Sequence, residues 1–287
     1  YYLYSDCLSP LTGVPSSLPS SFSEFEFNDK EDVVDYIELI KLIPKYYDNI
    51  MEFETKKAND GFGIQDFQID AVIDLCNEFI SNVDNHFLIT SFNSRINALT
   101  DLSDSEKSSY SKTNEDIVKN SIIPAYQKLI STLSTLKGKS VNDGGLCNFE
   151  NGAEYYELLV RSYTGSDLSV SEIKDKLTAK MQNDIGTVVS LSYKDETLYD
   201  KMSVYPFDTT DPDTILKYLL EAIKADFPEG YDTNYTINNV PADIEKYESP
   251  AYFYVPHIDN TSRNNIYINK YEDYADMDLY PTLAHEG

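Results

Sequence analysis

The sequence predicts a mainly α-helical protein, with a multi-helical body and one small β-hairpin just before a final helix. Apolar residues recur at spacings of three and four along most of the chain up to residue 227, as in amphipathic helices. Capping residues, prolines and glycines stand where these helices would begin and end. Two aromatic and β-branched runs, 251–255 and 265–269, then flank a polar turn, as the strands of a hairpin do.

Residues 1–27 are expected to be extended and loop-like, because prolines, a glycine and a cluster of serines interrupt any helical period. An arm that docks on the helical body is favoured over an unstructured linker, which is the alternative. The apolar side chains that favour docking are Leu3, Leu8, Leu11, Val14 and Leu18.

The next part of the chain is predicted to be helical over residues 28–61, 65–83, 87–99 and 104–136. Asn28 or Asp29 caps the first helix, Pro44 kinks or divides it, and Pro124 bends the last one. His86 stands at a helix entrance, where a histidine is more often a structural hydrogen-bonding group than a ligand. The buried stripe expected for the second helix is Phe67, Ile69, Val72, Ile73, Cys76 and Phe79.

A turn-rich segment, residues 140–151, is a candidate boundary between two parts of the chain. It separates an N-terminal arm plus helical layer, residues 1–139, from a second helical lobe, residues 140–287. A connection inside one continuous domain is equally compatible with the composition of this segment.

The second lobe is expected to continue with helices. Gly165 ends one, Ser169 and Glu172 form a capping box for the next over residues 169–202, and Asp211 caps a third. The buried stripes expected for the last two are Ile173, Leu177, Met181, Ile185, Val188 and Val189, and then Ile215, Tyr218, Leu219, Ala222, Ile223 and Phe227.

The hairpin supplies three candidate site residues. Tyr252 and Tyr254 lie in its first strand, where they are candidates for substrate contact, because a peptide backbone can pair with a strand beside a catalytic helix. A small sheet that only caps the helical body is equally compatible. His257 lies in the loop and is a candidate for stabilising an oxyanion, although loop histidines without such a role are commoner.

Composition excludes several classes of function. The net charge of −26 repels phosphate backbones and anionic lipids, so nucleic-acid binding and peripheral membrane binding are not expected. The longest apolar runs are too short to span a membrane. Cys7, Cys76 and Cys147 lack any CxxC spacing, which argues against a cysteine-built zinc site; one pair could still form a disulfide.

The chemistry suggested by the sequence lies at His285-Glu286. A His-Glu pair that follows apolar residues is how the metal-binding helix of a zinc peptidase begins. In that arrangement the imidazole binds the metal, and the carboxylate takes a proton from the metal-bound water. The second histidine that such a helix needs is absent from these 287 residues.

Three stretches resemble one bacterial family, domain of unknown function 885 (DUF885). They are DCLSPLTGVPSSLP near the start, GAEYYELL from Gly152, and YPTLAHEG at the end. Members of that family look like zinc metallopeptidases, in which the His-Glu pair is followed shortly by Pro-Gly-His. The resemblance implies that His285 is a zinc ligand and Glu286 the general base for hydrolysis of peptide substrates by metal-activated water. It also implies that the motif is cut off after Gly287.

Further expectations follow from this resemblance. The chain would lack the C-terminal half of its protein, and as written it would neither hydrolyse peptides nor hold Zn²⁺ tightly, because one histidine does not complete a three-ligand site. Family members are often exported, so an extracellular or cell-surface location is expected, with a lipid anchor as one route. Two rivals are a noncatalytic surface-exposed helical protein that binds peptide or glycan through its tyrosines, and a scaffold without a small ligand.

Overall fold

The computed structural model describes most of the chain, and two compact units are distinguished within it. The first unit comprises Tyr1–Asp143, Thr233–Met277 and Glu286, and the second comprises Gly144–Asp232, Asp278–His285 and Gly287. The described residues are 2–10, 12–23, 25–140, 142, 144–203, 209–228, 234–240, 245, 248–256, 264–274 and 279–286.

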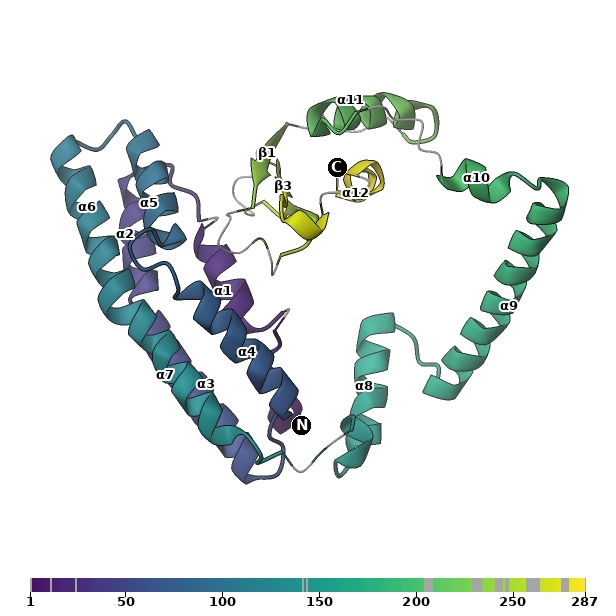
Figure 1. Cartoon of the computed structure of the whole chain (residues 1–287), viewed down its shortest axis with the longest axis horizontal. Coiled ribbons are helices and arrows are strands. Elements are labelled where there is room, and N and C mark those ends of the chain that lie inside the picture. Colours follow the sequence, from purple (N-terminus) through teal and green to yellow (C-terminus); the bar gives the residue numbers. More distant parts are fainter. Residues whose placement is uncertain are drawn as a thin grey trace. The chain divides into compact units, whose positions relative to one another are not determined.

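The first unit contains a helical layer and a small sheet (Figure 1). Its helices are η1 (Tyr2–Tyr4), α1 (Val14–Ser23), α2 (Lys30–Ile40), α3 (Ile43–Asn59), α4 (Asp66–Phe79), α5 (Phe87–Ala98), α6 (Asp104–Ile117), η2 (Val118–Ile122), α7 (Ile123–Leu136) and η6 (Glu272–Tyr274). Its strands are β1 (Tyr235–Asn239), β2 (Ala251–Tyr254) and β3 (Asn264–Ile268).

The second unit is helical. It holds η3 (Leu146–Asn148), α8 (Gly152–Thr164), α9 (Val170–Lys194), α10 (Leu198–Ser203), α11 (Pro212–Ala222), η4 (Ile223–Ala225) and, apart from Glu286, α12 (Leu279–Glu286). The prediction of a mainly α-helical fold is therefore confirmed. Across the described residues, no helix is long and apolar enough to cross a membrane.

The first unit is built around α7, which contacts both α3 and α4 (Figure 1). Apolar residues of these helices form one buried core, in which the ring of Phe79 stacks on that of Tyr126 at a centroid distance of 4.1 Å. Two tyrosine hydroxyls inside this core pair with each other, which avoids the free-energy cost of leaving them buried and unpaired. The Tyr47 hydroxyl donates to the Tyr126 hydroxyl over 2.7 Å.

The predicted helix signals of the first unit are largely confirmed. Asp29 caps α2 by accepting hydrogen bonds from two backbone N–H groups, and Pro44 stands in the first turn of α3. The long helix is interrupted before Pro124 by the π-helical segment η2. Proline has no N–H and its ring crowds the preceding turn, so a wider turn accommodates it. The prediction that Phe67 belongs to a buried stripe is wrong, because its side chain is exposed.

The expectation of an extended N-terminal arm is also wrong, because residues 14–23 form α1 despite Pro15 and Pro19. Pro15 lies in the first turn, where a helix needs no N–H donor, and both prolines are buried against the unit. Packing of this face outweighs the local cost of Pro19. Docking of the segment is confirmed, since Leu8 and Phe22 join the core. Leu11 lies outside the described residues.

The predicted hairpin is present. Strands β2 and β3 pair antiparallel, with Tyr252 opposite Tyr267 and Phe253 opposite Ile266. A further strand, β1, pairs parallel with β3, so the strand order is β1-β3-β2. The sequence did not predict β1, because two asparagines at its end are poor strand formers. This order leaves β2 at an edge of the sheet.

In the second unit the helix caps are those predicted from the sequence, but the predicted burial is not observed. Gly165 ends α8 with a positive φ of 62°, and Ser169 with Glu172 caps α9. The expected buried stripe of α9 is instead exposed, with 63% of Leu177 and 55% of Ile185 accessible. On α11 and beyond, Tyr218, Ile223 and Phe227 are exposed too, whereas Ile215 is buried. Periodicity indicates which face of a helix favours burial, and it does not supply the partner.

Candidate active site

The candidate site is built at the end of α12. Leu283 is fully buried and anchors this helix, and the ring of Tyr280 lies 6.2 Å from that of Tyr218 on α11. His285 follows two positions after Leu283, which is about 200° around a helix, and its side chain is exposed. The anchor and the imidazole therefore point in different directions, and His285 is accessible to a metal ion.

Glu286 ends α12 and belongs to the first unit, where it contacts the sheet. Its side-chain Oε2 accepts a hydrogen bond from the backbone N–H of Phe253 over 2.9 Å. Phe253 lies in the edge strand β2, and this N–H points away from β3. The carboxylate thus occupies a place where the backbone of an additional strand would pair with β2. No pattern in the sequence predicts this contact.

Tyr252 and Tyr254 alternate with Phe253 and therefore lie on the opposite face of the strand. Both rings approach Tyr267 of β3. The Tyr252 and Tyr267 rings stack with centroids 5.1 Å apart, and the Tyr254 ring meets Tyr267 edge-on at 6.5 Å. Tyr252 and Tyr267 also pack against the core of the unit. Packing thus explains Tyr252, and a substrate role for either tyrosine stays a prediction.

The other two histidines are not brought to this site among the described residues. His257 lies outside them, so its suggested role in stabilising an oxyanion stays a prediction. His86 is buried at the N-terminus of α5, where its Nδ1 accepts a hydrogen bond from the backbone N–H of Leu88. Burial lowers the pKa of His86 to about 4, so its imidazole is neutral at physiological pH. This is the structural role expected from the sequence.

The described residues hold neither an assembled metal site nor a disulfide. The described part of the chain contains no group of three His, Cys, Asp or Glu side chains that could hold a metal ion. A histidine such as His285 is a side chain that zinc can bind, but the described residues do not complete a three-ligand site, and a metal role for His285 stays a prediction. Cys7, Cys76 and Cys147 are free thiols, so the disulfide left open by the sequence is not formed. Burial raises the pKa of Cys76 to about 12.

The chain is similar to known proteins in both sequence and fold. Residues 3–287 match the family described as bacterial protein of unknown function, DUF885. A candidate lipoprotein from Colwellia psychrerythraea has a similar solved structure, with a TM-score of 0.80 and 16% sequence identity. The match covers 98% of this chain and 52% of the Colwellia chain, so this chain spans about half the length of that neighbour. No protein with a curated description matches. The family match covers almost the entire sequence, and the chain therefore belongs to the DUF885 family.

Proposed function

We propose that these residues form part of a zinc-dependent peptidase, in which His285 is one metal ligand and Glu286 is the general base. The observation that carries the proposal is the hydrogen bond from the Phe253 N–H to the Glu286 carboxylate. It holds a proton acceptor at the open edge of a β-strand, and in sequence this acceptor directly follows an exposed imidazole. A peptidase needs a base, a metal ligand and a peptide-binding strand close together.

The substrate in this proposal is an extended peptide that pairs with the free edge of β2. Main-chain hydrogen bonds to an edge strand bind peptides with little dependence on side chains, and the side chains of the strand adjust the preference. On binding of a peptide in this way, the Phe253 N–H would donate its hydrogen bond to a substrate carbonyl instead of to Glu286. Glu286 would then be free to accept a proton from the attacking water.

The described residues do not complete the zinc site of this proposal. A catalytic zinc site takes three protein ligands, and His285 is one. We propose that the others belong to a longer chain, since the similar Colwellia chain is about twice the length that matches here. The description of that neighbour as a candidate lipoprotein also supports an exported, cell-surface location, which we include in the proposal.

The test is Glu286→Gln in the longer protein. Glutamine keeps the size of the side chain and an oxygen for the Phe253 N–H, and it removes the proton acceptor. We expect zinc content to stay the same while kcat for peptide cleavage falls about 10²- to 10⁴-fold, the usual contribution of a general base. Zinc is measured by elemental analysis, and cleavage by mass spectrometry of a peptide mixture.

The matched control is Glu272→Gln, which removes the same charge from an exposed carboxylate in a different helix, η6. It should leave cleavage unchanged. A third variant, His285→Ala, should lose zinc as well as activity. Undiminished cleavage by the Glu286→Gln protein would remove Glu286 from the mechanism. A longer protein that binds peptide without metal and cleaves none would favour the noncatalytic binding protein instead.

A further inference from the structure

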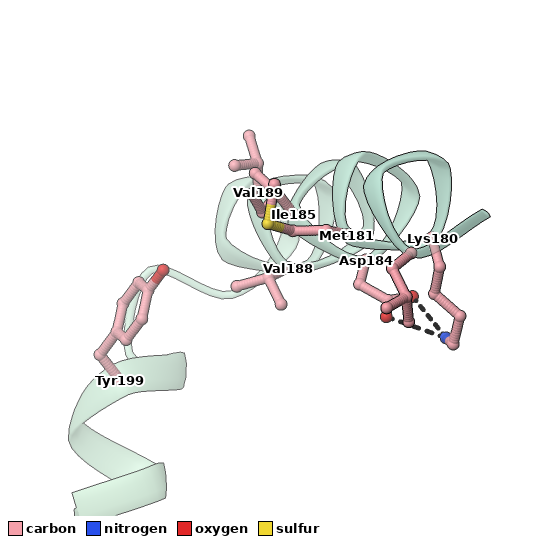
Figure 2. Close-up of a pocket in the computed structure, with 8 residues that line it drawn as sticks. Lys180, Met181, Asp184, Ile185, Val188, Val189 and Tyr199 are labelled. Atoms are coloured by element: carbon pink, nitrogen blue, oxygen red, sulfur yellow. Dashed lines mark hydrogen bonds and ion pairs between the residues drawn. The ribbon is translucent and has the colours of Figure 1, made fainter. Parts of the chain in front are cut away.

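The exposed stripe of α9 is a feature that the proposed function does not use. Together with Tyr199 of α10 it lines an open groove of about 570 Å³ (Figure 2). The lining is mainly apolar, and it also includes the ion pair between Lys180 and Asp184. The apolar lining residues on α9 are Leu177, Met181, Ile185, Val188 and Val189.

Each of these five side chains is more than two-fifths exposed. They recur at spacings of four and three, so they share one face over roughly 18 Å of helix. Exposed apolar patches of this kind mark interaction sites, because a soluble protein otherwise keeps such side chains scattered. None of the 25 residues of α9 is buried, which is unusual for a helix with an apolar stripe.

Helix α9 is nevertheless well formed by local interactions. Ser169 and Glu172 exchange capping hydrogen bonds at its N-terminus, and Lys194 lies in its last turn, where a positive charge stabilises the helix dipole. The apolar face is therefore presented on a helix that is already ordered. Docking of a partner there would lose little conformational entropy, because the helix is already ordered.

Two observations identify the partner. About half of the similar Colwellia chain has the fold described here. In that protein, a fold of this kind is therefore covalently joined to a second half of similar length. A second copy of this chain is disfavoured, because two molecules of net charge −26 repel each other. We propose that the α9 groove is covered by an apolar segment of the same, longer polypeptide, drawn from the half without a counterpart in these 287 residues.

This inference does not depend on zinc or on catalysis, and its test measures stability. Ile185→Lys places a charge in the centre of the stripe. Ala179→Lys adds the same charge at an exposed position of α9, about 120° around the helix from Ile185 and well away from the stripe. Both variants are made in the longer protein and in the 287-residue chain. Thermal unfolding and amide hydrogen exchange of α9 are measured for each.

In the longer protein we expect α9 to exchange at least about tenfold more slowly than in the 287-residue chain. Ile185→Lys should abolish this protection and lower Tm by several degrees there, because it buries an unpaired charge. Ala179→Lys should do neither, and both variants should leave the Tm of the 287-residue chain unchanged. Equal exchange of α9 in the two proteins would overturn the proposal. So would a dimer of the 287-residue chain, seen by light scattering, that Ile185→Lys dissociates.

Discussion

At the scale of single residues, a buried ion pair within α3 holds the N-terminal segment through hydrogen bonds. The Lys57 ammonium lies 3.3 Å from the Glu54 carboxylate and donates to the backbone oxygen of Ser5 over 2.8 Å. The Cys7 thiol donates to the same carboxylate over 3.1 Å. Only 1% of the Glu54 side chain and 4% of the Lys57 side chain are exposed. Both partners are needed, because either charge alone would be buried without compensation.

The pKa of Glu54 shows the balance of forces in this cluster. Burial raises the pKa of the Glu54 carboxyl, and the Lys57 charge opposes this shift. The folded state therefore binds the Glu54 proton more tightly than the unfolded state does. This contribution to stability is present below the ordinary pKa of a glutamate and is lost as the pH rises through the raised pKa.

Lys57→Met tests this account. Removal of the partner should raise the pKa of Glu54 further and lower the free energy of unfolding by about 3–5 kcal/mol at pH 7, the usual cost of breaking a buried pair. The deficit should shrink as the pH falls towards 4, since a protonated Glu54 needs no partner. Urea unfolding at several pH values measures it.

The neighbouring Lys56→Met is the matched control for Lys57→Met. Lys56 pairs with Asp60 at the exposed end of the same helix, so its loss should change the free energy of unfolding little. Adding Glu54→Gln to Lys57→Met should recover part of the stability. A deficit that does not change with pH would mean that lost packing, and not the Glu54 charge, explains the effect.

At the scale of elements, α1 and α9 show opposite relations between local signals and packing. Helix α1 contains two prolines and forms because its face is buried against the first unit. Helix α9 has none of its residues buried and relies on its caps and its own hydrogen bonds. The stability of α9 should therefore depend on capping more strongly than that of a packed helix does.

Ser169→Ala tests the dependence of α9 on its cap. Loss of the side-chain acceptor for the Glu172 N–H costs about 1 kcal/mol in helices, which corresponds to roughly fivefold faster amide exchange. We expect this acceleration in the first turns of α9 in the 287-residue chain. Ser190→Ala, an exposed change on the same helix, should leave those amides unaffected. Equal exchange in both variants would show that the capping box does not limit the fraying of α9.

At the scale of the whole molecule, the proposed zinc ligand and the proposed base would not by themselves make a peptidase. We expect the 287-residue chain, after dialysis against zinc, to hold well below one equivalent and to cleave no peptide, because His285 alone cannot bind the metal tightly. Elemental analysis and a peptide digest measure this. Stoichiometric zinc would show that ligands exist outside the described residues of this same chain, with His257 as the first to test.

The sequence alone determined the features that depend on neighbours within about four positions. These include the helical periods, a cap at Asn28 or Asp29 and another at Ser169, an irregularity at Pro124 and a hairpin formed by the runs 251–255 and 265–269. Such signals are readable because capping and turn formation involve residues close in sequence. The His285-Glu286 pair was likewise visible as a motif.

Tertiary structure decided what depends on distant partners. It made α1 helical, added β1 to the sheet and left the stripe of α9 exposed. It also joined the Glu286 carboxylate to the Phe253 N–H, 33 positions away in sequence. No local pattern specifies such contacts, because burial and strand pairing depend on which surfaces meet in space. For the same reason the proposed chemistry rests on a motif visible in the sequence, whereas the proposed binding of a peptide at β2 rests on a contact that only the tertiary structure supplies.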